Sequence, residues 1–216
     1  MVTNDHKEAL VADIQPLIDP LRHQSGDGPC GAPVEPAAAG RTVHTLAVQT
    51  GCDDRCSYCV IPRTRGRGRS RSIAEVLRRV KAASDAGFKE VVLSGVHLGS
   101  FGRDRRPASS LVDLLRALDR QNAACRLRLS SLEPMDCTGA LIDLVARSGR
   151  FVPHFHLPLQ HASDACLRAM GRPYSLSDYR RVVDTVRDRL PDAAIGSDAM
   201  AGFPGETERD HDTHVA

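Results

Sequence analysis

The chain has 216 residues, of which 41% are hydrophobic and 4% aromatic, and its formal net charge is +2. This length suffices for one well-packed core, and so small a net charge excludes the strongly basic class of nucleic-acid-binding proteins. No run of residues approaches the roughly 18 to 20 apolar positions of a membrane-spanning helix, and the polar N-terminus lacks the apolar region of a signal peptide. The seven cysteines are an odd number, which argues against a disulfide framework and predicts a reducing, cytoplasmic environment.

The first forty residues differ in composition from the rest. Residues 7–19 have apolar positions at helical spacing, whereas residues 26–40 are rich in Gly, Pro and Ala, as linkers are. We therefore divide the chain into an N-terminal segment with a linker, residues 1–40, and a core domain, residues 41–216. Cys30 stands alone in the linker and is interpreted as an incidental thiol.

Strands and helices are predicted to alternate through the core domain. Ser72 and Glu75 form a capping box that begins the first helix, and later helices follow Ser110 and Thr138. About five strand–helix units of this kind predict an α/β fold in which a parallel sheet curls into a partial (βα) barrel. The predicted strands are residues 43–49, 90–94, 126–131, 154–160 and 193–198, and the last two helices cover about residues 163–170 and 177–190.

Polar residues stand where each predicted strand ends. In barrels of this kind the functional groups collect at the carboxyl ends of the strands, so we expect these residues to line one pocket. Glu133 is equally compatible with a loop cap before Pro134. The strand ends are Gln49 to Cys59, Ser94-Gly95, Ser130 to Glu133, Gln160-His161 and Asp198.

Cys52, Cys56 and Cys59 form a C-x-x-x-C-x-x-C motif directly after the first predicted strand. Thiolates are soft ligands that favour zinc or iron–sulfur clusters, and closed sites of either kind usually take four ligands. No fourth Cys or His follows at a typical spacing, so one coordination position is left open. This favours a reactive metal centre, with a zinc knuckle or three buried structural thiols as the alternative interpretations.

Five arginines alternate along residues 63–71, next to the cysteine motif. Guanidinium groups suit phosphate because their planar fork donates two hydrogen bonds at once. The run is compatible with a solvated basic loop and, beside an active site, with contact to an anion or an RNA backbone. The residues are Arg63, Arg65, Arg67, Arg69 and Arg71.

The cysteine motif, with Tyr58 before its last cysteine, resembles the signature of the radical S-adenosylmethionine (SAM) enzymes. Further runs spread over residues 42–207 resemble the methylthiotransferase family of these enzymes. Residues 93–100 and 130–136 are most similar to the branch that modifies N6-threonylcarbamoyladenosine at tRNA position 37. The branches that act on isopentenyladenosine in tRNA or on a ribosomal protein match less well. The matching runs are Gly51 to Pro62, Arg65-Gly66, Ser70 to Ser72, Val91 to Gly102, Arg128 to Asp136, His156 to Gln160 and Ala201 to Thr207.

The resemblance implies a function and two cofactors. Cys52, Cys56 and Cys59 are expected to hold three irons of a 4Fe–4S cluster, and SAM to chelate the fourth. The implied reaction adds a methylthio group to carbon 2 of the adenine, with the tRNA anticodon loop as substrate and a flavodoxin or ferredoxin as electron donor. The residues expected to contact SAM or line its pocket are Tyr58, Ser94, Gly95, Ser131, Glu133, Gln160 and Asp198.

The chain differs from the family pattern at both ends. Family members have an N-terminal domain with three further cysteines for a second cluster, which Cys30 alone cannot replace, and they continue beyond Thr207 into a sixth strand and an RNA-binding β-barrel. We therefore expect an internal segment of a longer enzyme, or the product of a split or shortened gene that works with a partner. A non-catalytic iron–sulfur electron-transfer protein and a zinc-binding structural module are the alternatives from other functional classes.

Overall fold

The computed structural model describes residues 42–215, and strands and helices alternate through this part of the chain. Parallel strands lie in the order β1-β3-β4, the pair β5-β6 follows, and β2 joins the edge of β1 antiparallel. A parallel bridge between Leu127 and Phe151 links the two groups. The strands are β1 (Val43–Thr50), β2 (Arg69–Ser70), β3 (Glu90–Gly95), β4 (Arg126–Leu129), β5 (His154–His156) and β6 (Ala194–Gly196).

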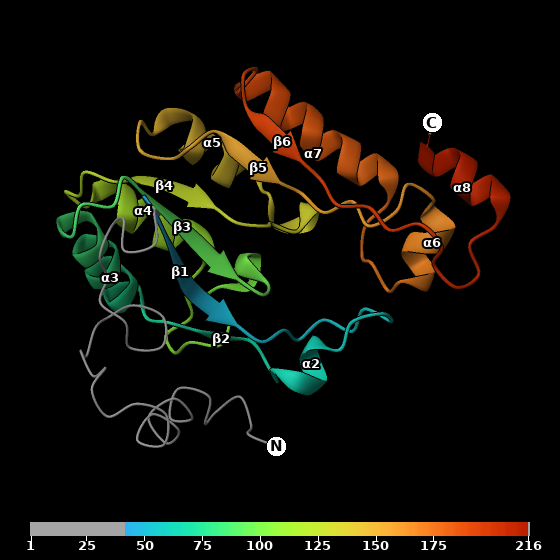
Figure 1. Cartoon of the computed structure of the whole chain (residues 1–216), viewed down its shortest axis with the longest axis horizontal. Helices are drawn as coiled ribbons and strands as arrows, with labels where there is room; N and C mark the ends of the chain where they lie inside the picture. Colours follow the sequence, from blue (N-terminus) through green and yellow to red (C-terminus); the bar gives the residue numbers. More distant parts are fainter. Residues whose placement is uncertain (1–41, 216) are drawn as a thin grey trace.

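The sheet curls into an open half-barrel, which confirms the predicted partial barrel. Figure 1 shows α3, α4, α5 and α7 along its outer side, whereas α2, α6 and α8 lie toward the end at which β1 and β3 point. None of the described helices is long and apolar enough to cross a bilayer. The helices are α2 (Ile61–Thr64), α3 (Ile73–Asp85), α4 (Leu111–Arg120), α5 (Gly139–Arg147), α6 (Asp164–Ala169), α7 (Leu176–Arg189) and α8 (Glu208–Val215), with 3₁₀ turns η3 (Leu98–Ser100) and η4 (Pro134–Asp136).

The two faces of the sheet differ in polarity because successive side chains of a strand point to opposite sides. Val91 and Leu93 of β3 are fully buried in the hydrophobic core that the strands form with the helices. Glu90 of β3 and Arg128 of β4 form an ion pair, with 2.6 Å between Arg128 Nε and Glu90 Oε1. The apolar run of residues 90–94 predicts a strand that is buried on both faces. Val92 and Ser94 are only half-buried, however, because the described helices leave the inner side of the half-barrel open (Figure 1).

Side-chain caps begin α3, α4 and α5 at Ser72, Ser110 and Thr138, as the sequence predicts. Ser72 Oγ accepts a hydrogen bond of 3.2 Å from the Glu75 amide at the start of α3. The Glu75 carboxylate does not complete the predicted capping box, because it accepts hydrogen bonds from Arg71 (2.5 Å) and Arg79 (3.1 Å) instead. A complete capping box does form at Ser110, where α4 begins.

The predicted strand at residues 154–160 is shorter in the structure. β5 ends at His156, since Pro158 has no amide hydrogen to donate to a ladder and Gln160 adopts a left-handed backbone with φ +67°. The predicted helix at residues 7–19 and the linker that follows lie outside the described residues.

We predict that Leu115→Ala destabilises the fold by about 2–5 kcal/mol, because Leu115 of α4 is fully buried and its removal leaves a cavity. Denaturant unfolding followed by circular dichroism measures the loss. The exposed neighbour Arg116 is the control, since Arg116→Ala is expected to change stability by no more than about 0.5 kcal/mol. Equal losses in the two variants would show that α4 does not pack on the core as described.

Candidate metal centre

The cysteine motif occupies the loop that leaves the carboxyl end of β1. Gly51 turns the chain there with φ +69°, and the Cys52 amide donates a hydrogen bond of 3.1 Å to the Gly66 carbonyl. A Cβ atom at Gly51 would lie 2.0 Å from the Arg67 carbonyl oxygen. Only glycine therefore fits where the loop turns back against residues 66–67.

The three thiols of this loop lie within electrostatic range of one another. Burial raises the pKa of the Cys52 thiol, and the charges of Asp54, Cys56 and Cys59 raise it further, although a hydrogen bond from the Asp54 amide acts in the opposite direction. The Cys59 amide donates to the Cys56 carbonyl at 3.1 Å, which brings these two residues into one turn. Because metal ligation stabilises thiolates, a cation at this position would remove their mutual repulsion, so the donor set fits a thiolate-bound metal group.

The segment that follows α6 holds the other side of the loop. Ser57 donates through its amide to the Met170 carbonyl and through its hydroxyl to the Ala169 carbonyl, both at 3.0 Å. Gly171, with φ +74°, brings its backbone against the Arg55 carbonyl. The cysteine loop is thus fixed between β1 and the end of α6.

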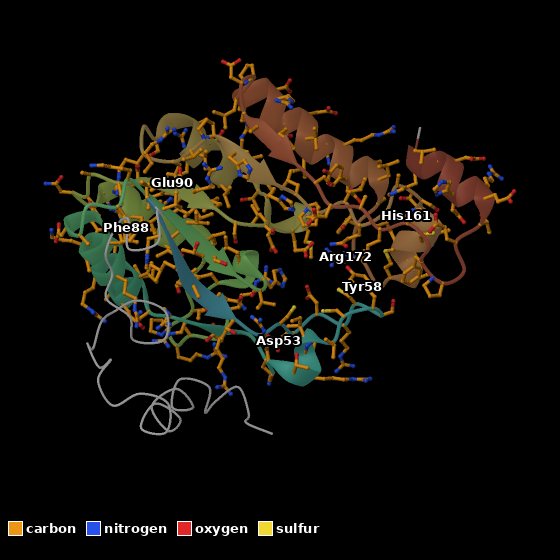
Figure 2. The ribbon with its side chains drawn as sticks, in the orientation of Figure 1. Asp53, Tyr58, Phe88, Glu90, His161 and Arg172 are labelled. Carbon is orange, nitrogen blue, oxygen red and sulfur yellow. The ribbon has the colours of Figure 1, made fainter. Side chains whose placement is uncertain are left out.

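A buried arginine reaches the loop from this second side. The Arg172 side chain is 2% exposed; its Nη1 lies 3.2 Å from Cys56 Sγ, and its Nη2 donates to the Glu133 carboxylate. Its guanidinium stands 5.1 Å above the centre of the Tyr174 ring. Figure 2 shows Arg172 and Tyr58 at one end of the sheet, with Glu90 and Phe88 at the opposite end. The sequence did not reveal Arg172, because 116 residues separate it from Cys56.

A buried histidine reaches the loop from the end of β3. His97 Nδ1 lies 3.1 Å from Asp54 Oδ2 and 3.8 Å from Cys52 Sγ, and Nε2 lies 2.6 Å from Asp136 Oδ2. Burial raises the pKa of the Asp136 carboxyl, but the hydrogen bond from His97 and the charge of Arg103 outweigh it, so the pKa lies below its usual value. The ionised Asp136 thereby orients the imidazole toward the cysteine loop.

This histidine bears on the zinc interpretation. The ligand atoms of Cys52, Asp54 and His97 all lie within 4.8 Å of one another, which is compatible with a metal ion. Thiolate, carboxylate and imidazole are all ligands of zinc. Sequence spacing missed this arrangement because His97 follows a different strand, β3, and lies 45 residues from Cys52. The local geometry by itself accommodates either zinc or an iron–sulfur cluster.

Four of the residues predicted to bind SAM lie at the ends of β3 and β4. Ser94 and Gly95 end β3 and are half-buried, and a Cβ atom at Gly95 would come within 3.1 Å of the Gln49 side chain. Ser131 follows β4 and is exposed, whereas Glu133 pairs with Arg172. The structure thus brings Glu133 to the cysteine loop, and its predicted contact with SAM stays a prediction, as do those of the other three.

The other three predicted SAM-site residues have partners of their own. Tyr58 meets Phe203 edge-on with ring centres 6.5 Å apart, and burial raises the pKa of Tyr58 to about 12. The Gln160 amide donates to the Asp198 carbonyl at 3.0 Å, and the exposed Asp198 carboxylate lies 3.0 Å from His156 Nε2. Their roles toward SAM stay predictions.

The arginine run has mixed roles in the structure. Arg71 Nε donates to the Ala47 carbonyl at 2.8 Å and its Nη1 to Glu75, so Arg71 ties α3 to β1. Arg67 pairs with Asp53 at 3.0 Å, although both side chains are largely exposed. The remaining members of the run are exposed beside the cysteine loop.

Comparison with known proteins decides the family. Residues 46–216 match the Radical SAM superfamily. The chain belongs to this superfamily. Radical SAM enzymes use a 4Fe–4S cluster and SAM, so the predicted cofactors are confirmed at the level of the superfamily, and membership favours the cluster over zinc.

Among solved structures, the fold is similar to that of the radical SAM methyltransferase TsrM from Kitasatospora setae, determined with cobalamin and a [4Fe-4S] cluster bound. The TM-score is 0.66 and the sequence identity is 21%, over 80% of this chain and 33% of that one.

Two curated radical SAM relatives are equally similar in sequence. The tRNA-2-methylthio-N(6)-dimethylallyladenosine synthase of Alkaliphilus oremlandii is 38% identical over 165 residues, which are 76% of this chain and 35% of that protein. The threonylcarbamoyladenosine tRNA methylthiotransferase MtaB of Bacillus subtilis is 38% identical over 176 residues, 81% of this chain and 39% of that protein. The chain therefore spans less than two fifths of the length of either relative. Because both relatives are 38% identical to it, sequence identity does not distinguish between the two modified adenosines that their names give.

We predict that Gly51→Ala prevents cluster assembly, since the added Cβ collides with the Arg67 carbonyl and moves Cys52. Iron per chain after anaerobic reconstitution is the measurement. Gly66→Ala is the matched control, because Gly66 also has a positive φ of 73° but no atom within 4 Å of an added Cβ, so only backbone strain of about 1–2 kcal/mol is expected. Full iron content in Gly51→Ala would show that this turn does not position the thiols.

Proposed function

We propose that this chain is the SAM-cleaving segment of a tRNA methylthiotransferase, with Cys52, Cys56 and Cys59 as the cluster ligands. The observation that carries the proposal is the single loop on which three interacting thiols lie, at the carboxyl end of β1. The names of the two curated relatives, one a 2-methylthio-adenosine synthase and the other a methylthiotransferase of tRNA, support the reaction.

The chain's own residues bind and orient in this proposal. When bound, the cluster and SAM supply the electron and the radical that removes hydrogen from the substrate. Cys52, Cys56 and Cys59 keep three thiolates together, and the polar ends of β3 and β4 offer hydrogen bonds to SAM. Tyr58 and Phe203 form an aromatic edge beside the site.

We propose N6-threonylcarbamoyladenosine as the base that is modified. The two runs that resemble this branch meet in the structure, since His97 of the first lies 2.6 Å from Asp136 of the second. Gly99 is also closely apposed, because a Cβ atom there would lie 2.3 Å from the Asp136 carboxyl. The two runs that resemble this branch therefore contact each other beside the cysteine loop. Isopentenyladenosine in tRNA is the runner-up, supported by the name of the Alkaliphilus relative.

Three partners belong to the proposal. The tRNA anticodon loop would place phosphates beside the exposed Arg63 and Arg65, since arginine contacts to phosphate position a nucleic acid without reading its sequence. An electron donor such as a flavodoxin or ferredoxin would reduce the cluster. A further domain or a split-gene partner would supply the sulfur, because family members hold a second cluster with three further cysteines, which Cys30 alone cannot replace.

We predict that Cys56→Ala abolishes the 4Fe–4S cluster and the formation of 5′-deoxyadenosine from SAM, since two thiolates leave the cluster short of a ligand. Absorption and electron paramagnetic resonance spectra after anaerobic reconstitution, with chromatography of the nucleoside, measure both effects. Cys30→Ala is the control and is expected to keep its iron. Stoichiometric zinc without cluster absorption would favour the structural module, and a reducible cluster that yields no 5′-deoxyadenosine would favour the electron-transfer alternative.

We predict that the reduced chain with SAM forms more 5′-deoxyadenosine with tRNA carrying N6-threonylcarbamoyladenosine than with tRNA carrying isopentenyladenosine, because productive binding of the base commits SAM to cleavage. Chromatography measures the nucleoside, and mass spectrometry of the digested tRNA locates any methylthio group. Unmodified tRNA is the control. The reverse preference would assign the chain to the isopentenyladenosine branch.

A further inference from the structure

One ion pair of the site contains Arg172, which is neither a predicted cluster ligand nor a predicted SAM-binding residue. The Arg172 guanidinium and the Glu133 carboxylate face each other beside Cys56, and the Arg172 side chain is almost fully buried. A buried charge is costly unless it is paired and hydrogen-bonded, and Arg172 makes contacts that hold it in place. Its Nε lies 3.3 Å from the Tyr174 hydroxyl, which itself donates to the Pro158 and Leu159 carbonyls at 3.2 and 3.1 Å.

The fork of the guanidinium points in two directions. Nη2 donates to Glu133, while Nη1 lies 3.2 Å from Cys56 Sγ. The adjoining backbone supports this geometry, because Gly171 packs on the Arg55 carbonyl and Met170 accepts a hydrogen bond from Ser57. The same short segment thus fixes both the cysteine loop and the cation that faces it.

We propose that Arg172 and Glu133 are positioning residues that set the reduction potential of the cluster through the Cys56 thiolate, an inference that rests on the proposed cluster ligation. Reduction adds one electron from an external donor and therefore one negative charge to the cluster. Hydrogen bonds to the sulfur ligands and the net charge nearby tune such potentials. A cation that donates to Cys56 stabilises the reduced form, and the neighbouring carboxylate partly opposes it.

Opposite shifts of the potential follow from this arrangement. Arg172→Gln removes the cation and leaves the Glu133 charge beside the cluster, so the midpoint potential becomes more negative. Glu133→Gln removes the opposing charge, so the potential becomes more positive. A tenfold change in the equilibrium constant for reduction corresponds to about 59 mV for one electron, and we expect at least this shift for Arg172→Gln. A merely structural role would lower iron content without opposite shifts.

The experiment is a redox titration of the reconstituted full chain, followed by electron paramagnetic resonance, with iron content measured in every variant. Arg168→Gln is the matched control, since Arg168 is an exposed arginine of α6, and its potential is expected to equal that of the wild type. Arg172→Lys keeps the positive charge, so its midpoint potential is expected to lie closer to that of the wild type than the potential of Arg172→Gln does. It also replaces Arg172→Gln if the neutral variant fails to fold.

Four results would overturn the inference. Shifts of the same sign in Arg172→Gln and Glu133→Gln, or wild-type potentials in both at full iron content, would show that the pair does not act on the cluster. If Arg172→Gln does not fold and Arg172→Lys is used in its place, a wild-type potential in Glu133→Gln would also show that the pair does not act on the cluster. A wild-type chain that binds no cluster would instead overturn the proposed function and this inference together, so the two failures are distinguishable.

Discussion

The cysteine loop is fixed to the half-barrel by backbone hydrogen bonds on both of its sides, and the geometry of the site depends on this constraint. On the β1 side the Cys52 amide donates to Gly66, and on the α6 side the Ser57 amide donates to Met170. Both contacts need a close approach of two backbones, which glycine permits at Gly51 and Gly171. Together the two contacts fix the segment that carries Cys52, Cys56 and Cys59.

The curled sheet explains why polar groups gather at this loop. Its outer face is covered by helices and is apolar, whereas its inner face has the Glu90–Arg128 pair and, further along, the ends of β3 and β4. Charges inside a half-barrel are partly desolvated, so each is stable only with a partner. The pairs His97–Asp136 and Arg172–Glu133 follow the same rule, and both touch the thiols.

This pairing connects the family resemblance to physical contacts. Residues 93–100 and 130–136 are separate runs in the sequence, yet His97 and Asp136 are hydrogen-bonded and Glu133 reaches Arg172. A substitution in either run would therefore change the surroundings of the cysteine loop. Both runs thus supply side chains that pair with the residues facing Cys52 and Cys56.

Local patterns in the amino-acid sequence were sufficient to predict the α/β alternation, the serine caps of α3 and α4, and the position of the cysteine motif after β1. Each of these features depends on residues that are neighbours along the chain. Periodicity did not reveal that β5 stops at His156, since Gln160 takes a left-handed backbone that its residue type does not require. Nor did spacing reveal Arg172 or His97, which lie 116 and 45 residues from the cysteines they face. Only the folding of the sheet brings these side chains together, because contacts between distant strands and helices leave no local signature in the order of residues.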